Sequence, residues 1–214
     1  MRLEPVPGGF SLSLGGRELI RHTTDSPFVF AGRGEERMEM IRGNFDISDY
    51  LTERAPLAHA EIDGDVLRFR RDAGGPVWLA LRLSGSESEA VLSTIHAAPG
   101  LNRFWFRLPA KQGEHVWGCG EQMSYLDLRG RRFPLWTSEP GVGRDKTTAI
   151  TFQADVAGRA GGDYCTTNYP QPSFLSSRRY SAHLETTAYS AFDFRHSGFH
   201  ELEVWAAPER LELR

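Results

Sequence analysis

The sequence predicts an all-β fold in which residues 1–214 form a single domain, an antiparallel β-sandwich of two sheets. Three observations support this prediction. Apolar and polar residues alternate along many short segments, which is typical of strands with one buried face. The chain holds 22 glycines and 12 prolines, and turn-forming residues separate the alternating segments. No long stretch has the three- and four-residue apolar spacing of an amphipathic helix.

Each clear run of alternation predicts one strand. In chain order, the apolar-face positions are Phe10, Leu12 and Leu14, then Val77, Leu79, Leu81 and Leu83, then Phe104, Phe106 and Leu108, then Thr148, Ile150, Phe152 and Ala154, then Phe192, Phe194 and His196, then Leu202 and Val204. Residues 62–67, around Asp63-Gly64, predict a hairpin. Residues 35–40 are the best short helical candidate, although their pattern fits a strand almost as well. The close spacing of the strands favours a two-sheet sandwich.

The charge balance argues against several classes of partner. Lysine and arginine number 25, aspartate and glutamate number 28, and the net charge is −3. We therefore expect neither nucleic-acid binding nor a basic membrane-binding patch. The longest apolar runs are far shorter than the roughly 20 residues that span a bilayer. The N-terminus has no apolar run of signal-peptide length, so we expect a cytoplasmic protein in which Cys119 and Cys165 are reduced.

Common cofactor and metal signatures are incomplete. Three Gly-x-Gly pairs, at residues 32–34, 118–120 and 141–143, lack the third glycine and the strand-to-helix context of a phosphate-binding loop. We interpret them as tight turns. His196 and His200 have the four-residue spacing of helical zinc ligands, but they flank a predicted turn between two strands. We expect no metal and no cofactor, while a Cys–His nucleophile pair stays open for either cysteine.

Two loop-rich stretches, residues 118–142 and 156–172, are the expected location of function, since loops on a rigid sandwich usually carry it. The segment from Trp117 to Lys146 combines aromatic, carboxylate, amide and guanidinium groups. Such groups bind sugars by stacking on their apolar faces and by hydrogen bonding to their hydroxyls. The candidate substrate-loop residues are Glu121, Gln122, Glu139 and Arg144. In the alternative interpretation, the aromatic residues fill the core and Glu139 and Arg144 hold each other.

Several motifs together carry a family resemblance. They are Trp-Gly-Cys-Gly-Glu-Gln at 117–122, Leu-Asp-Leu-Arg-Gly at 126–130, Phe-Pro-Leu-Trp at 133–136 and the loop at 137–146, with further stretches at 33–36, 42–45, 160–164, 168–172 and 185–196. These motifs resemble the N-terminal part of bacterial sulfoquinovosidases of glycoside hydrolase family 31, the α-glucosidase family. The loops at 139–146 and 168–172 are its most specific features. The resemblance covers nearly the whole chain.

The resemblance implies a galactose-mutarotase-like sandwich that precedes a catalytic (β/α)₈ barrel. Enzymes of this family hydrolyse α-linked sulfoquinovosides, such as sulfoquinovosyl glycerol, with retention of anomeric configuration. One aspartate attacks the anomeric carbon, and a second carboxylic acid protonates the leaving oxygen and then activates water. Both carboxylates and the sulfonate-binding residues lie on the barrel. The resemblance therefore places the barrel after residue 214, outside this chain, and assigns no catalytic residue here.

The resemblance also implies a role for the loops. The sandwich is expected to support its partner, the barrel, and to lend residues 137–146 to the rim of the active site, with residues 163–172 as a second candidate. Arg144 is expected to orient an active-site carboxylate or to meet the anionic sugar. Glu121, Gln122 and Glu139 are expected to hold the loop or to reach hydroxyls of the leaving group.

Two other functional classes stay open. A free-standing carbohydrate-binding module would use Trp78, Trp117 or Trp136 as a flat platform for a sugar ring. A sugar epimerase would need a paired acid and base in a cleft. Its candidate histidines, each requiring a neighbouring carboxylate, are His115, His183 and His200.

Overall fold

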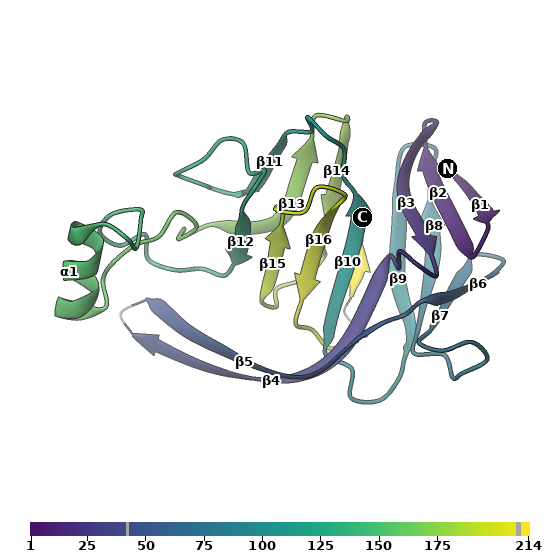
Figure 1. The fold of residues 1–214 in the computed structure, drawn as a ribbon, viewed down its shortest axis with the longest axis horizontal. Coiled ribbons are helices and arrows are strands. Elements are labelled where there is room, and N and C mark those ends of the chain that lie inside the picture. The colour runs from purple at the N-terminus through teal and green to yellow at the C-terminus, as the bar shows by residue number, and fades with distance from the viewer. Residues whose placement is uncertain (42, 209–210) are drawn as a thin grey trace.

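The computed structural model describes residues 1–41, 43–208 and 211–214 (Figure 1). Arg42, which belongs to the motif at 42–45, lies outside the described residues. Within the described part, strands dominate, and every ladder between named strands is antiparallel. The predicted all-β antiparallel sandwich is confirmed.

The largest sheet contains six strands in the order β12-β15-β16-β10-β4-β5. Its members are β4 (Val29–Ile41), β5 (Asn44–Pro56), β10 (Arg103–Pro109), β12 (Arg132–Leu135), β15 (Ser190–Asp193) and β16 (Phe199–Val204). The inner face of β10 carries Phe104 and Phe106, as its alternation predicts, and Trp105 on the opposite face is buried as well. A strand that is apolar on both faces belongs inside a sheet rather than at its edge, and β10 lies between β16 and β4.

Three smaller sheets complete the fold. One contains β1 (Arg2–Val6), β2 (Gly9–Leu14) and β3 (Arg17–Thr23), and a second contains β11 (Val116–Gly120), β13 (Pro170–Ser176) and β14 (Tyr180–His183). The third has the order β17-β9-β8-β7-β6 and contains β6 (His59–Asp63), β7 (Val66–Arg70), β8 (Leu79–Gly85), β9 (Ala90–Ala97) and β17 (Glu212–Leu213). Reciprocal backbone hydrogen bonds between His183 and Arg214, both 2.8 Å, join the second sheet to the third.

Phenylalanines fill the space between the sheets. Phe174 of β13 packs against Phe192 of β15, with ring centroids 6.0 Å apart, so the second small sheet covers part of the six-stranded sheet. Phe28 lies between Phe106 of β10 and Phe69 of β7, at 5.5 and 6.5 Å. These contacts connect the two halves that Figure 1 shows side by side into one apolar core.

Two local predictions can be compared with the strands directly. The hairpin around Asp63-Gly64 is confirmed, because Asp63 pairs with Val66 and Gly64 has the positive φ of 62° that this tight turn requires. Residues 35–40, the short helical candidate, lie inside β4 and pair with β5. The strand alternative was therefore correct for this segment.

The predicted strand over residues 148–154 is wrong, because α1 (Ala149–Gly158) occupies this region. The backbone amide and the hydroxyl of Thr148 both donate to the carbonyl of Asp145, and this turn leads into the helix. Arg159 ends it with a left-handed φ of 51°, and the amides of Arg159 and Ala160 donate to carbonyls of the last turn. Local turn and cap interactions therefore determine this segment, and its alternation does not report a buried face.

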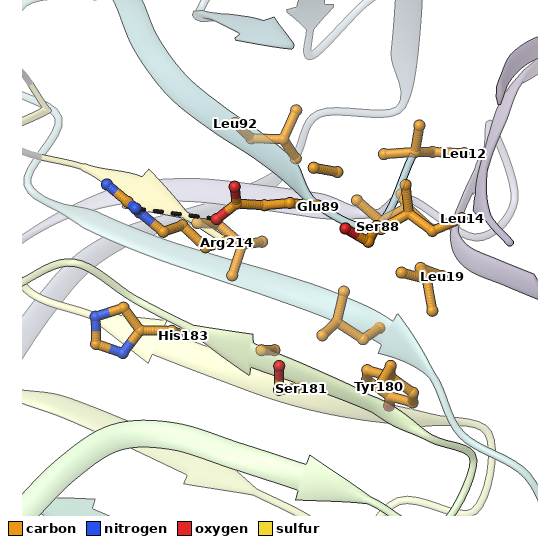
Figure 2. Close-up of a pocket in the computed structure, with 15 residues that line it drawn as sticks. Leu12, Leu14, Leu19, Ser88, Glu89, Leu92, Tyr180, Ser181, His183 and Arg214 are labelled. Carbon is orange, nitrogen blue, oxygen red and sulfur yellow. Dashed lines mark ion pairs between the residues drawn. The ribbon is translucent and has the colours of Figure 1, made fainter. Parts of the chain in front are cut away.

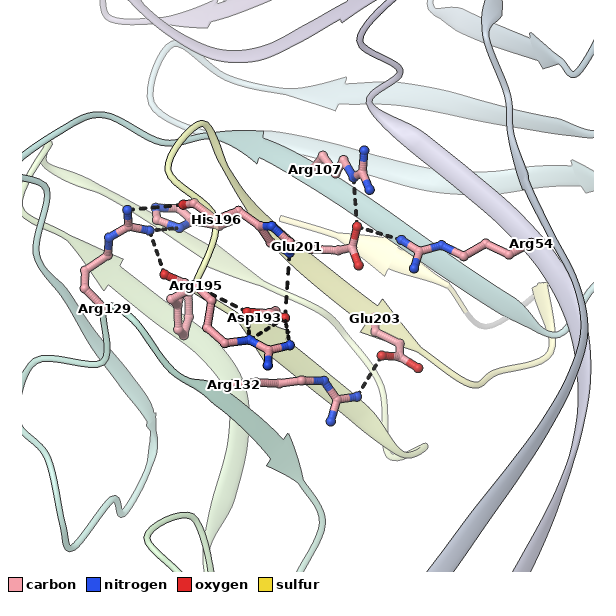
Figure 3. Close-up of polar contacts among 11 residues, drawn as sticks. Arg54, Arg107, Arg129, Arg132, Asp193, Arg195, His196, Glu201 and Glu203 are labelled. Carbon is pink, nitrogen blue, oxygen red and sulfur yellow. Dashed lines mark hydrogen bonds and ion pairs between the residues drawn. The ribbon is translucent and has the colours of Figure 1, made fainter.

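The outer face of the six-stranded sheet carries ordered ion pairs (Figure 3). Glu201 accepts hydrogen bonds from Arg54 at 2.7 Å and from Arg107 at 2.8 Å. Arg132 donates to Glu203 at 2.8 Å, one pleat along the same face. Each of these three arginines is thus held by a glutamate of β16.

Candidate functional site

The candidate loops gather in one projecting part of the molecule, which we call the arm. The arm consists of residues 137–167, including α1, together with the β4–β5 hairpin tip at residues 43–46. In Figure 1, α1 and this hairpin extend beyond the sheets on the same side of the molecule. The arm therefore brings together segments that are about 100 residues apart in the sequence.

Hydrogen bonds fix the hairpin tip to residues 138 and 139. The backbone amide of Glu139 donates to the carbonyl of Gly43 at 3.1 Å, and the hydroxyl of Ser138 donates to the side chain of Asn44 at 2.9 Å. Gly43 has a φ of 79°, and a side chain there would meet the methylene groups of Glu139. Glycine is therefore needed at this contact. The Glu139 side chain itself is exposed.

Arg144 joins the two loop-rich stretches. Its Nη1 donates to the carbonyl of Thr166 at 2.9 Å and to the Thr166 hydroxyl at 3.1 Å, and it reaches the carbonyl of Pro140 at 3.5 Å. Its Nη2 lies 3.2 Å from the sulfur of Met123. Among the described residues, no ion pair joins Arg144 to Glu139, so the alternative in which these two simply hold each other does not describe this loop. The guanidinium is half-buried and holds three segments together.

Glu121 and Gln122 follow β11, in a turn with unusual backbone. Gly118, Cys119 and Gly120 have φ values of 126°, 59° and 78°, and Cys119 is a rare non-glycine residue in the left-handed region. The Glu121 amide donates to the carbonyl of Tyr169 at 2.9 Å, and the Gln122 amide nitrogen donates to the carbonyl of Cys119 at 2.9 Å. This turn therefore packs beside the second loop-rich stretch.

The four candidate residues are thus brought into one region but not into one contact set. Gln122 is followed by Met123, and Glu139 by Pro140, and both of these neighbours meet Arg144. Glu121 and Glu139 are exposed, whereas Gln122 is half-buried with its side-chain carbonyl oxygen buried and without a hydrogen-bond partner in the described part of the chain. The loops are therefore held by hydrogen bonds, and they carry two exposed carboxylates.

A cavity of about 520 Å³ lies between the hairpin tip and the arm loops. Its wall combines backbone, charged and thiol groups from Ile41, Asn44, Phe45, Asp46, Ser138, Lys146, Asp155, Arg159, Gly161, Asp163, Cys165 and Thr166. The ammonium group of Lys146 lies 2.7 Å from Asp155, and the guanidinium of Arg159 lies 3.0 Å from Asp46. Both cations of the wall are therefore already paired with carboxylates.

Neither thiol is placed as a nucleophile. Burial raises the pKa of the Cys119 thiol, and burial raises the pKa of Cys165 to about 11. A thiol with a raised pKa is protonated near neutral pH and reacts slowly. Neither residue forms a disulfide. The structure therefore gives no support to a Cys–His pair.

Each histidine named in the sequence analysis has a local partner. His200 is buried against Glu114, and His196 stacks on Phe199 with ring centroids 4.3 Å apart. Within residues 1–41, 43–208 and 211–214, no three His, Cys, Asp or Glu side chains are grouped as a metal site requires. His115 pairs with Asp127 at 2.7 Å at the surface, where their side chains are 59% and 42% exposed.

His183 is the remaining epimerase candidate, and it lines a cavity of about 490 Å³ (Figure 2). Most of this wall is apolar, with leucines such as Leu12, Leu14, Leu19 and Leu92 around Tyr180. Figure 2 shows the imidazole of His183 directed away from these leucines. A sugar epimerase needs a paired acid and base that face its substrate. The carboxylate of Glu185 lies 3.5 Å from His183 Nε2, but Glu185 does not line this cavity.

Sequence reasoning missed several residues that build the arm. Thr166, Met123 and Asp155 were given no role, although each contacts Arg144 or Lys146. The motif at 42–45 contributed to the family resemblance but did not predict the hairpin tip or where it packs. No short-range pattern reveals these contacts, because the partners of Arg144 are 21 and 22 residues away in irregular loops.

Comparisons with known proteins bear on the whole chain. The chain matches no profile of a known protein family. It is 56% identical over 213 residues to the sulfoquinovosidase of Agrobacterium fabrum, covering 100% of this chain and 32% of that protein. It is 41% identical to the sulfoquinovosidase of Escherichia coli K12, covering 92% of this chain and 29% of that protein.

A solved structure agrees with these relatives. The fold matches a family 31 sulfoquinovosidase from E. rectale, solved with an aza-sugar inhibitor, with a TM-score of 0.88 and 42% identity. The match covers 100% of this chain and 32% of that structure, so the chain spans about a third of the length of these relatives. In the residues that the structure describes, no helix is long and apolar enough to cross a membrane. In sequence and in fold, the chain corresponds to the N-terminal part of glycoside hydrolase family 31 sulfoquinovosidases.

Proposed function

We propose that the chain is the N-terminal β-sandwich of a retaining α-sulfoquinovosidase, which hydrolyses sulfoquinovosyl glycerol and related α-sulfoquinovosides. The observation that carries this proposal is the 56% identity over the whole chain to an enzyme named for that activity. The catalytic carboxylates would come from a (β/α)₈ barrel outside residues 1–214. The fragment alone is expected to be inactive, because it contributes neither the nucleophile nor the general acid.

The role proposed for the chain is to support the barrel and to complete the rim of its active site with the arm. The bracing by Arg144 supports this role, because a loop that positions substrate has to be held in place before substrate binds. Glu139 is the candidate for a direct contact, since its backbone is fixed to Gly43 while its carboxylate faces solvent. Arg144 is proposed mainly as a positioning residue, with its contact to the sugar as a further prediction.

Overall charge does not oppose an anionic substrate. A net charge of −3 would not attract a sulfonate at long range. A few placed arginines on the barrel would suffice, since guanidinium groups bind anionic oxygens through paired hydrogen bonds. The arginines on the outer sheet face are held by Glu201 and Glu203, which fits a supporting domain of this kind.

An exchange experiment tests the proposed function. In the exchange enzyme, this chain takes the place of the matching third of the Agrobacterium fabrum sulfoquinovosidase. Hydrolysis of a chromogenic α-sulfoquinovoside by the exchange enzyme supports the proposal. A folded exchange enzyme that leaves this substrate intact contradicts it. The isolated chain is the matched control, and it should release no product.

The carbohydrate-binding module is the alternative, and one observation favours it. Trp117 lines a groove of about 660 Å³ together with Leu175, Arg179 and Tyr180. The other two candidate tryptophans are less available, because Trp136 packs against Phe45 and Arg33 lies 5.5 Å from the ring centre of Trp78. Calorimetric titration of the isolated chain with sulfoquinovose, glucose and oligosaccharides distinguishes the two functions. Millimolar or tighter binding that Trp117→Ala removes would favour the module.

A further inference from the structure

Helix α1 has the composition of a buried helix. Residues 149–158 read Ala-Ile-Thr-Phe-Gln-Ala-Asp-Val-Ala-Gly, and Asp155 is the one charged residue among them. This carboxylate is turned toward its own loop, since it accepts the amide of Gly161 at 2.8 Å and pairs with Lys146 at 2.7 Å. A helix on a water-facing surface normally presents charged side chains along its outer side. This one presents none.

The large apolar side chains of α1 nevertheless face solvent. Ile150, Phe152 and Val156 are 60%, 62% and 72% exposed. Phe152 and Val156 are four residues apart, so they lie next to each other on one side of the helix. Thr151, on a different side, is the buried residue that faces the arm. The helix is therefore packed on its Thr151 side, and on its exposed side Gln153 is the one polar residue among apolar neighbours.

The surface is fixed in position. Lys146 also donates to the carbonyl of Gly161 at 2.8 Å, which connects the segments before and after α1. Arg159, at the C-terminal end, pairs with Asp46 of the hairpin tip at 3.0 Å. The helix is thus attached to the loop and to the hairpin. A pre-positioned apolar surface loses little conformational freedom when a partner covers it.

We propose that the apolar surface formed by Ile150, Phe152 and Val156 docks against the part of the longer enzyme that this chain does not contain. This inference rests on the proposed function. The relatives have about two thirds of their length beyond the matched region, since the match covers 32% of the Agrobacterium fabrum protein. The helix belongs to the arm that is proposed to reach the active-site rim, so the same partner lies beside it.

The chemistry of the surface favours this occupant. Permanent interfaces are more apolar than transient ones and are poor in charged residues at their centre. A helix that binds lipid surfaces carries lysines or arginines on its polar face, and α1 has no basic residue in its last turn or elsewhere along its length. The nearest cations, Lys146 and Arg159, are already paired with carboxylates. A permanent protein partner is thus favoured over a membrane.

The test compares one double variant in two contexts. Phe152→Gln with Val156→Gln keeps residues that favour a helix but makes the surface polar. In the isolated chain, these side chains face water, so the variant should unfold at the same temperature as the parent chain. In the exchange enzyme, they are covered, so the half-life of activity at elevated temperature should fall by about tenfold or more.

A control outside the helix makes the result specific. Ile95→Gln alters an exposed apolar residue on β9, in a different sheet. This variant should leave the half-life of the exchange enzyme unchanged. An equal half-life for the double variant and the parent exchange enzyme would overturn the proposed docking surface.

The remaining outcomes also decide between occupants. Light scattering measures the mass of the isolated chain. A dimer that the double variant converts to a monomer would show that a second copy covers the helix, and the proposal would be wrong. An inactive but folded parent exchange enzyme would instead refute the proposed function, and with it the partner named here. Failure of the docking surface alone leaves the parent exchange enzyme active, so the two failures are distinguishable.

Discussion

Glu114 and His200 form a buried pair in which His200 Nε2 lies 3.1 Å from Glu114 Oε1 and both side chains are fully buried. Arg129 Nη1 lies 3.2 Å from the other ring nitrogen of His200. A guanidinium can only donate, so Nδ1 accepts and the proton of the imidazole is on Nε2, from which it is donated to Glu114. The pair connects the loop before β11 to β16 inside the core.

Replacing Glu114 with glutamine should destabilise the fold by about 2–4 kcal/mol. Burial would raise the pKa of Glu114, but hydrogen bonds from His200 and Ser176 outweigh it and lower the pKa to about 2. Glutamine has one acceptor oxygen, so its NH₂ group would oppose either His200 or the amide of Lys111. Urea unfolding at pH 7 measures the loss, with the exposed Glu87→Gln as the control. Equal losses for the two variants would contradict this account.

The pH dependence of stability should show the burial of His22. Its Nδ1 accepts the amide of Phe28 at 3.2 Å, its Nε2 lies 3.2 Å from the carbonyl of Ala58, and burial lowers its pKa to about 4. Between pH 6.5 and about 4 the unfolded chain therefore binds a proton that the folded chain does not, and stability falls as the pH falls. The loss from this residue across the window is on the order of 3 kcal/mol.

An NMR titration of the histidine ring signals checks the His22 prediction directly. The His22 signals should remain those of a neutral ring down to about pH 5. Titration of His22 close to the ordinary histidine pKa of about 6.5 would contradict the prediction.

Arg103→Lys should cost about 1–3 kcal/mol, although it preserves the charge. Arg103 is buried, and its Nη2 donates to Glu36 at 2.6 Å and to Asp49 at 3.0 Å. Its guanidinium also lies 4.4 Å from the ring centre of Trp205. A lysine ammonium cannot reproduce this planar stack together with both ion pairs. Thermal unfolding of this variant beside the exposed Arg2→Lys measures the difference, and an unchanged melting temperature for Arg103→Lys would contradict it.

Arg144→Ala in the exchange enzyme should lower kcat/KM for an α-sulfoquinovoside by about tenfold, because the loops that meet at Thr166 and Met123 lose their brace. Arg144→Lys should recover part of this loss if the role is positioning, since an ammonium can still reach one carbonyl. Separate kcat and KM values distinguish loop positioning from a direct contact with the sugar. Unchanged efficiency together with unchanged stability would exclude a substrate-loop role.

The strands could be predicted from the sequence because their alternation is local. The alternation of Phe104 and Phe106 predicted β10, and Asp63-Gly64 predicted the hairpin between β6 and β7. The helix at 149–158 could not be predicted in the same way, since Ile150 and Phe152 mimic a strand while facing solvent. Apolar–polar alternation indicates a buried face only where the segment packs against the rest of the chain. The apolar side of α1 does not pack against this chain.

The four candidate residues lie in neighbouring loops, but the contacts of these loops could not be predicted. Glu121, Gln122 and Glu139 belong to the loop-rich stretch at 118–142, whereas Arg144 follows it and joins it to the second stretch. The buried Arg103 and the Glu114–His200 pair escaped sequence analysis, because charged residues carry no sequence signal of burial. Their partners are distant in the sequence and come close only in the folded chain.

The most direct test of the central claim is the rate at which the exchange enzyme hydrolyses a chromogenic α-sulfoquinovoside, compared with the Agrobacterium fabrum enzyme itself. If this chain is the N-terminal part of such an enzyme, kcat/KM of the exchange enzyme should lie within about tenfold of the parent value, a difference of about 1.4 kcal/mol. A folded exchange enzyme with no detectable hydrolysis would contradict the claim.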